Sequence, residues 1–266
     1  MTKKSKQSYG NYIIDNKENI LKRKKKIIRV KKTILLLIVL ISILITLGFT
    51  LPNFNLSEIL VSGVVNLSEE SVIASTNIEK GINIFKIKTN KIERGLSENP
   101  YILSSKVSRK YPNKIAIKVE ERKLAYYTEM SGGYYIIDDR GVVLEKKDNI
   151  DGLNLLRLDG LNEDLLKIGE PIKDIEAEKL TALCDIYSFL EKNQFFEKYN
   201  IAKVEINDFI DLKLYVNKVY IKLGTVEGVN DKIAKAFSII TTPEFNDFKG
   251  YIDVSFDGNP VIYKEK

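Results

Sequence analysis

Residues 33–51 read TILLLIVLISILITLGFTL, a stretch without a charged side chain. An α-helix rises about 1.5 Å per residue, so a helix of this length spans about 28 Å, close to the roughly 30 Å hydrocarbon core of a bilayer. A cleaved signal peptide would have a shorter apolar core followed by a small-x-small cleavage site. Residues 47–52, LGFTLP, provide no such site. The pattern therefore predicts a retained transmembrane helix over residues 33–51.

The charges that flank this segment predict its orientation. Residues 1–32 hold twelve Lys or Arg against two acidic residues, whereas Lys80 is the one basic residue of 52–85. Basic residues next to a transmembrane helix remain on the cytoplasmic side of the membrane. We therefore expect residues 1–32 to form a basic cytoplasmic tail, and the rest of the chain beyond the helix to lie outside the cytoplasm.

The positive net charge of the chain belongs to this tail. The whole chain has 42 basic and 36 acidic residues, of which 30 basic and 34 acidic residues lie beyond the helix. The exported part is therefore near −4, which is not the composition of a nucleic-acid-binding domain. The tail is expected to lie against anionic lipid headgroups. Membrane lipid is thus an expected partner, and nucleic acid is not.

The residue inventory restricts the chemistry. The chain has no His, no Trp and a single Cys. Without His, neither a Ser-His or Cys-His dyad nor an imidazole metal site can form. Cys184 shares a helical stripe with Leu183, Tyr187 and Leu190, and this spacing predicts a buried packing cysteine rather than a nucleophile. We expect no catalytic residue, no cofactor and no metal.

Residues 54–123 show the order β-α-α-β-β. The β-branched run at 59–65 predicts the first strand. Two short helical segments follow, each preceded by a Ser or Thr that can cap it. Residues 107–120 then predict a β-hairpin, because apolar and polar residues alternate after a Tyr-Pro-Asn-Lys turn.

Residues 124–266 predict a second, β-rich domain. A hairpin is expected around Asp138 and Gly141, because glycine tolerates the positive φ of a tight turn. The elements expected after it are a helix at 175–198, strands at 203–206, 211–216 and 219–223, a helix around 233–240, and strands at 251–256 and 261–263. The predicted fold class is α+β: a transmembrane helix, a β-α-α-β-β module, and a mixed β-rich domain with helices packed on its sheet.

Two motifs carry a resemblance to a known family. Residues 108–122, SRKYPNKIAIKVEER, resemble the POTRA hairpin of the FtsQ/DivIB family of bacterial cell-division proteins. Residues 134–144, YYIIDDRGVVL, resemble the hairpin that opens the second domain of that family, with Asp138 and Gly141 at the matching positions. The family commonly has Pro-Val-Ala after the first hairpin, where this chain has Lys-Leu-Ala at 123–125.

The resemblance implies a POTRA domain at 54–123 and an FtsQ/DivIB-type β domain at 124–266. It also implies a non-enzymatic, single-pass scaffold in the cell membrane, enriched at the division septum. The implied partners are FtsL-type and FtsB/DivIC-type proteins and the septal peptidoglycan synthase complex, whose activity the scaffold helps to regulate.

The resemblance further implies a partner-binding site, because the small coiled-coil partner of the family adds a strand to the last part of the β domain. The matching positions are Ser255, Phe256, Asp257, Gly258, Val261 and Tyr263. A last strand is a natural sheet edge, open to pairing with another chain, and Pro260 suits an edge because it lacks an N–H group. Alternation predicts that Ser255 points away from the face of Val254 and Phe256. The competing interpretation makes Val254 and Phe256 core residues that Tyr263 covers.

Two other functional classes were compatible with the sequence. A POTRA-containing export or assembly factor would be expected to repeat the module, and no repeat is evident. An anchored cell-wall enzyme would use paired carboxylates, for which the candidates are Glu120 with Glu121 and Asp138 with Asp139. Adjacent residues on a strand point to opposite faces, so neither pair is expected to converge on one substrate.

The orientation can be tested with protease added to spheroplasts. We expect everything after residue 52 to be degraded and the basic tail to survive, because positive flanking charge retains the tail in the cytoplasm. Antibodies against a tag at each end would follow the two fragments, and lysed spheroplasts would serve as the control in which both are digested. Protection of the large domain in intact spheroplasts would overturn the orientation.

Overall fold

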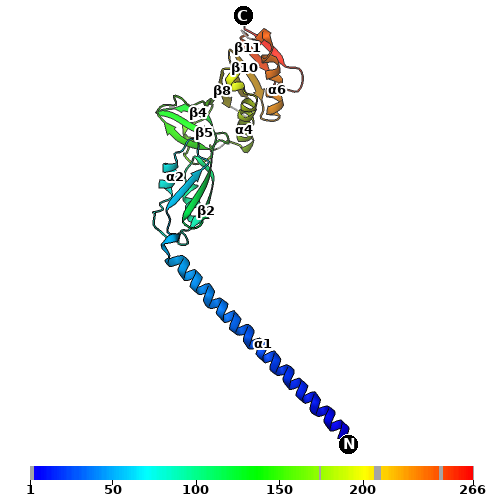
Figure 1. Ribbon diagram of the computed structural model, residues 1–266. Coiled ribbons are helices and arrows are strands. Elements are labelled where there is room, and N and C mark those ends of the chain that lie inside the picture. Colours follow the sequence, from blue (N-terminus) through cyan, green and yellow to red (C-terminus); the bar gives the residue numbers. More distant parts are fainter. Residues whose placement is uncertain (1–2, 174, 207–210, 246–247, 266) are drawn as a thin grey trace. The chain divides into compact units, whose positions relative to one another are not determined.

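The computed structural model describes residues 3–173, 175–206, 211–245 and 248–265, with side chains from residue 21 onward except residue 22 (Figure 1). Backbone contacts divide the chain into two compact units. The first comprises Met1–Leu60, Glu79–Lys88 and Ser108–Ala116, and the second comprises Val61–Ile78, Thr89–Val107 and Ile117–Lys266. The predicted α+β class is confirmed: an N-terminal apolar helix precedes a β-α-α-β-β module and a β-rich domain with helices.

The N-terminal helix α1 runs from Lys3 to Thr50, and its part Arg23–Thr50, 28 residues long, is apolar enough to cross a membrane. It is longer than the predicted segment because the basic tail continues the same helix (Figure 1). Lys and Arg are good helix formers, so a charge boundary does not end a helix. Leu51 leaves the helix, although its N–H still donates to the carbonyl of Leu47 at 2.9 Å.

The β-α-α-β-β order predicted for the next segment is confirmed. After the short 3₁₀ turn η1 (Pro52–Phe54), the elements are β1 (Glu58–Ser62), α2 (Glu69–Ser75), α3 (Thr89–Leu96), β2 (Ile102–Lys110) and β3 (Lys114–Glu121). Their sheet has the strand order β1-β3-β2. Ser68 caps α2, as its hydroxyl accepts the N–H of Ser71 at 3.1 Å. Strand β2 begins at Ile102, earlier than the predicted start at residue 107. The sequence did not reveal this start, because Ile102 and Val107 are the only buried residues of the strand and do not alternate with exposed ones.

Glu121, at the end of β3, holds the segment that follows β1. Its carboxylate accepts backbone N–H groups from Val65 at 2.8 Å, Asn66 at 2.8 Å and Leu67 at 3.0 Å. Burial opposes ionisation of this carboxyl, but the hydrogen bonds from Leu67, Val65 and Asn66 outweigh it and lower the pKa of Glu121. One of the proposed catalytic carboxylates is therefore committed to the backbone.

The second domain is built on one nine-stranded sheet with the order β12-β11-β10-β9-β8-β7-β4-β5-β6. Its strands are β4 (Leu124–Met130), β5 (Gly133–Asp138), β6 (Val143–Lys147), β7 (Leu156–Asp159), β8 (Ile201–Ile206), β9 (Leu212–Val216), β10 (Val219–Gly224), β11 (Gly250–Asp253) and β12 (Val261–Lys264). The helices are α4 (Ala177–Lys192), α5 (Phe195–Lys198) and α6 (Val229–Ile240), with 3₁₀ turns η2 (Glu163–Leu165) and η3 (Pro243–Phe245). The predicted helix at 175–198 is thus two helices, separated at Gln194, whose φ of 56° is left-handed.

The core of this domain lies between the sheet and helices α4 and α6 (Figure 1). Buried residues from both sides form one cluster, among them Leu214, Val216, Ile221, Leu183, Ile186, Ile233 and Phe237. Full burial of one such side chain contributes about 1.5–3 kcal/mol, against about 0–1 kcal/mol for an exposed ion pair. The apolar face therefore decides the stability of the sheet. Cys184, in the middle of α4, is partly exposed, so the prediction of a buried cysteine was wrong.

Asp138 is the turn residue predicted at the end of β5. It also binds Arg122, which lies just before the first strand of the domain. It is 1% exposed, and its carboxylate accepts the N–H groups of Arg140 at 2.9 Å and Val142 at 2.6 Å. Its second oxygen accepts Nη1 of Arg122 at 2.9 Å. A buried carboxylate is costly unless it is paired and hydrogen-bonded, and here both conditions are met. Gly141 has the positive φ expected of the turn, 80°.

The role of Glu121 predicts a pH-dependent stability. Glu121→Gln should lower the free energy of unfolding of the part of the chain beyond α1 by about 1 kcal/mol at pH 7, because a partly exposed charged acceptor is lost. The folded-state pKa lies below the unfolded value of about 4.3, so this contribution is present above that pH and disappears as the pH falls through the folded pKa. Denaturant melts from pH 7 to pH 3 should show the gap to the native protein closing in acid.

The matched control is Glu120→Gln. Glu120 is exposed and accepts a side-chain hydrogen bond from Ser104 at 2.7 Å, so its loss should cost less than that of Glu121. A gap for Glu121→Gln that stays constant down to pH 3 would contradict the assigned role.

Candidate partner-binding site

Strand β12 forms one end of the nine-stranded sheet. It pairs antiparallel with β11, with Tyr263 opposite Tyr251, Ile262 opposite Ile252 and Val261 opposite Asp253. Among the described residues no strand lies on its other side. Its apolar side chains are exposed: Val261 by 48%, Ile262 by 46% and Tyr263 by 53%. The last strand is therefore an open, apolar edge.

The backbone of β12 alternates between β11 and the open side. Beyond the strand, the N–H of Glu265 donates to the carbonyl of Lys249 at 2.9 Å, so these two residues form a hydrogen-bonded pair. In an antiparallel ladder such pairs alternate. Tyr263 therefore turns its N–H and C=O groups toward β11, whereas Ile262 and Lys264 turn theirs outward. Pro260 has the same parity as Ile262, at a position where a missing N–H does not disturb the ladder.

Gly250 lets β12 approach its neighbour. Its φ is 141°, and a Cβ atom there would lie 1.9 Å from the carbonyl oxygen of Tyr263. A glycine is thus required where β11 begins.

The loop between β11 and β12, residues 254–260, departs from the predicted strand. Strand β11 ends at Asp253, whose Oδ1 accepts the N–H of Ser255 at 3.0 Å and its hydroxyl at 2.6 Å. These bonds turn the chain out of the sheet. The prediction of a strand to residue 256 was wrong, and with it the alternation argument for Ser255. Val254 is buried, but Phe256 is 46% exposed and is not a core residue.

This loop borders a cavity of about 420 Å³ beside α6. The lining residues are Thr225, Glu227, Gly228, Asp231, Lys232, Lys235, Ser255, Phe256 and Asp257. Lys232 Nζ donates to the backbone carbonyl of Thr225 at 2.9 Å and to its hydroxyl at 3.2 Å. Burial lowers the pKa of Lys232, while Glu227 and Asp257 act in the opposite direction. The cavity is therefore polar and of mixed charge, with one exposed aromatic ring at its border.

The six predicted residues thus occupy two neighbouring features. Ser255, Phe256 and Asp257 line the cavity, Val261 and Tyr263 lie on β12, and Gly258 lies in the loop between them. Three residues of the same surface were not predicted: Ile262, Lys232 and Lys235. The two lysines are spaced i, i+3 on the polar side of a helix, and the sequence does not reveal that a distant loop faces them. Ile262 could have been included, because it lies between two predicted edge residues.

A row of tyrosines crosses the sheet and ends at this edge. The ring centroids of Tyr215 and Tyr220 are 5.7 Å apart, those of Tyr220 and Tyr251 are 5.3 Å apart, and those of Tyr251 and Tyr263 are 5.1 Å apart. Lys222 Nζ lies 4.1 Å from the centroid of Tyr251, within cation–π range. Stacked rings on neighbouring strands stabilise strand pairing, so this row holds β12 in register.

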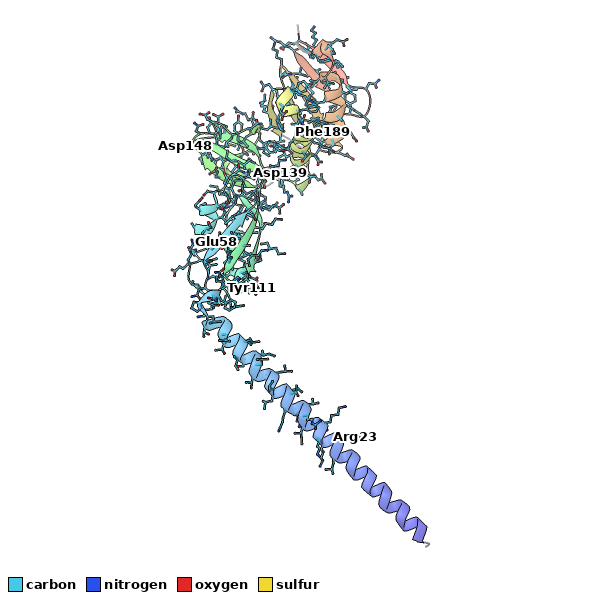
Figure 2. All side chains as sticks on the ribbon, in the orientation of Figure 1. Arg23, Glu58, Tyr111, Asp139, Asp148 and Phe189 are labelled. Atoms are coloured by element: carbon cyan, nitrogen blue, oxygen red, sulfur yellow. The ribbon has the colours of Figure 1, made fainter. Side chains whose placement is uncertain are left out.

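The other three carboxylates that were candidates for an enzyme are Asp138, Asp139 and Glu120. Burial, and then the charge of Asp138, raise the pKa of Asp139, which is labelled in Figure 2. Its neighbour Asp138 is occupied by Arg122 and by backbone amides. Glu120 accepts a bond from Ser104. These contacts give Asp138 and Glu120 structural roles.

Comparisons with known proteins agree with this architecture. The family described as POTRA domain, FtsQ-type, matches residues 54–122. Cell division protein DivIB of Clostridium tetani (strain Massachusetts / E88) is 40% identical over 228 residues, which cover 85% of each chain. Cell division protein DivIB of Clostridium botulinum (strain Hall) is 35% identical over 250 residues, 94% of this chain and 97% of that protein. Cell division protein DivIB of Bacillus subtilis (strain 168) is 26% identical over 247 residues, 90% of this chain and 88% of that protein. With such identity over most of its length, the chain belongs to the FtsQ/DivIB family of cell division proteins.

Proposed function

We propose that this protein is a non-enzymatic scaffold of the division septum that joins FtsL-type and FtsB/DivIC-type partners and helps to regulate septal peptidoglycan synthesis. In this proposal residues 1–32 form the cytoplasmic tail and residues 33–51 span the cell membrane. The POTRA domain comprises 54–123, and the partner-binding β domain comprises 124–266. Membership in a family of cell division proteins supports the cellular role.

The observation that carries the proposal is the open edge of β12. A free edge with exposed apolar side chains is an aggregation hazard, and natural proteins usually cover or charge such edges. Within β12 the residues Val261, Ile262 and Tyr263 are exposed and only Lys264 is charged, and the further charged residues Glu265 and Lys266 lie beyond the strand in the sequence. An edge of this kind is suited to accept an extended segment of a partner chain, whose main chain supplies the hydrogen bonds.

The cavity beside the edge supports an extended interface. Phe256 borders the cavity and belongs to the same loop that leads into β12. A partner strand added at Ile262 and Lys264 can therefore continue toward Phe256, where an exposed ring offers apolar contact and Lys235 and Asp257 offer charges of both signs. A scaffold of this kind acts on wall synthesis by holding its partners in one complex. This role requires binding surfaces but no catalytic residue.

Removal of the edge strand tests the site. Deletion of residues 261–266 should leave the domain folded, because the side chains of β12 are exposed and bury little apolar area. It should abolish co-purification of the FtsB/DivIC-type partner, and a fusion carrying the deletion should fail to restore septation in depleted, filamentous cells. Thermal melting and pull-down are measured on the same preparation. A folded truncation that binds its partner as well as the full domain would sink the proposal.

A sharper test separates the backbone of the edge from its side chains. Ile262→Pro removes an outward N–H without removing a bond to β11, so the fold should tolerate it. The matched variant Ile262→Ala removes the side chain and keeps the N–H. If a partner strand pairs here, the proline variant should bind about tenfold more weakly than the alanine variant, the effect of one lost hydrogen bond. Equal affinities in a titration with the partner would exclude strand pairing at this position.

A further inference from the structure

Four aromatic rings gather where α1 ends, and we call Phe49, Phe54, Phe85 and Tyr111 the ring cluster. Phe85 is at its centre: its ring centroid lies 5.7 Å from that of Phe49, 5.3 Å from that of Phe54 and 5.8 Å from that of Tyr111. All four residues belong to the first compact unit. The cluster thus joins the last turn of the apolar helix to two loops that are distant in sequence.

Hydrogen bonds tie these loops to the helix end. The side-chain amide of the buried Asn83 donates to the carbonyl of Gly48 at 2.9 Å, and its oxygen accepts the N–H of Phe85 at 3.0 Å. Carbonyls in the last turn of a helix lack partners within the helix, so Asn83 satisfies one of them. The N–H of Ile84 also donates to the carbonyl of Phe54 at 2.9 Å. The ring cluster is therefore fixed relative to the end of α1.

This attachment sets the depth of the cluster in a membrane. Phe49 is the penultimate residue of a helix apolar enough to span the hydrocarbon core, and Tyr111 is two ring contacts away from it. The polar headgroup region on each side of a bilayer is roughly 5–7 Å thick, which is comparable to one such contact. Tyr111 is 66% exposed (Figure 2), and Ile82 on the neighbouring loop is 38% exposed. Exposed aromatic and apolar side chains at this depth meet lipid headgroups.

The charge of the same region differs from that of the rest of the exported part. Residues 51–60, 79–88 and 108–116 contain six basic and two acidic residues, although the chain beyond the helix has 30 basic and 34 acidic residues in total. The exposed members are Lys80, Lys86, Lys88 and Lys110. Arg109 links their loops, because its guanidinium donates to the carbonyls of Ile84 at 2.8 Å and Ile87 at 2.6 Å. The excess of positive charge is thus concentrated at the end of the domain next to the helix.

We propose that this tip is a second membrane contact, which inserts Tyr111 and Ile82 into the headgroup region and places Lys86, Lys88 and Lys110 on anionic lipid phosphates. The apolar helix anchors the chain, and the tip holds the start of the exported domain against the bilayer. Rings at the interface and nearby lysines are the two elements that peripheral membrane contacts combine. The occupant of this surface is the anionic lipid bilayer itself.

The absence of Trp from the sequence makes a direct test possible. The full-length protein carrying Tyr111→Trp is reconstituted into vesicles that contain brominated phosphatidylcholine as a quencher, with or without an equal share of phosphatidylglycerol. We expect strong quenching and a blue-shifted emission in the anionic vesicles, and clearly weaker quenching in the neutral ones. The control reporter is Tyr263→Trp, at an exposed tyrosine of β12 outside the tip, which should remain unquenched in both.

Lysine variants separate docking from mere tethering by the helix. In the Tyr111→Trp protein, Lys86→Gln, Lys88→Gln and Lys110→Gln together should reduce the quenching in anionic vesicles to the neutral level. Each lysine at an anionic surface strengthens membrane attachment roughly fivefold, so the three Lys→Gln substitutions together should weaken docking on the order of a hundredfold. The matched control changes three exposed lysines outside the tip, Lys118, Lys192 and Lys198, and should leave the quenching unchanged.

Each other outcome would overturn the proposal. Quenching of Tyr111→Trp that is equal in neutral and anionic vesicles, or that survives the three tip substitutions, would show that the helix alone brings the tip near the lipid. No quenching at all would place Tyr111 in water. Equal quenching of Tyr263→Trp would show that the contact with the bilayer is not specific to the tip. Circular dichroism of each variant confirms that the fold is retained.

Discussion

Burial of one face of the nine-stranded sheet beneath α4 and α6 is the interaction on which the β-rich domain depends. The helices cover the strands from one side, and the buried cluster includes residues of β9, β10 and β11 such as Leu214, Ile221 and Ile252. The cover does not extend to β12, where Ile262 is exposed although its partner Ile252 is fully buried. The last strand is thus held by its ladder with β11 and by ring stacking, while its own apolar side chains face solvent. A surface for a partner arises at the point where the core ends.

Much of this fold could be predicted, because local patterns carry it. The alternation in β9 and β10 gives strands whose bounds agree within one residue with the structure, and the predicted helix around 233–240 is present as α6, which begins one turn earlier, at Val229. Strand β7 was not predicted, because its four residues pair in parallel with β4 and β8 and no hairpin turn marks the strand in the sequence. The parallel pairing of β10 with β11 across α6 is a long-range arrangement that no local motif encodes. For the candidate site, the sequence indicated the edge, but the loop at 254–260 depends on hydrogen bonds from Ser255 to Asp253 that alternation does not reveal.

The roles of the carboxylates also could not be predicted from the sequence alone. From the sequence, Glu121 and Asp138 were candidates for acid–base chemistry, although alternation along the strand argued against a convergent pair and Asp138 was expected to form a turn. The folded chain surrounds each with backbone N–H groups and gives Asp138 an arginine as well. The energetic reason is that a carboxylate shielded from water must be paired or hydrogen-bonded, and turns and chain crossings are where unpaired N–H groups are available. The fold also gathers charged residues that are distant in the sequence. Lys86 and Lys110 belong to the same compact unit as the end of α1, although both lie far from α1 in the sequence.

Strand addition at β12 leaves the question of how one partner is selected. Main-chain hydrogen bonds are the same for any extended segment, so they contribute affinity without specificity, and selection depends on the pockets that receive side chains. In this protein two features beside the edge differ in chemistry. Tyr263 ends a row of stacked rings, whereas the cavity near Phe256 is lined by charges of both signs. Unpaired charges in such a cavity disfavour a partner that buries them without compensation. In the proposed interface the loop at 254–260 would have a double role, since it leads the chain into the edge strand and would supply the side chains that distinguish one incoming strand from another.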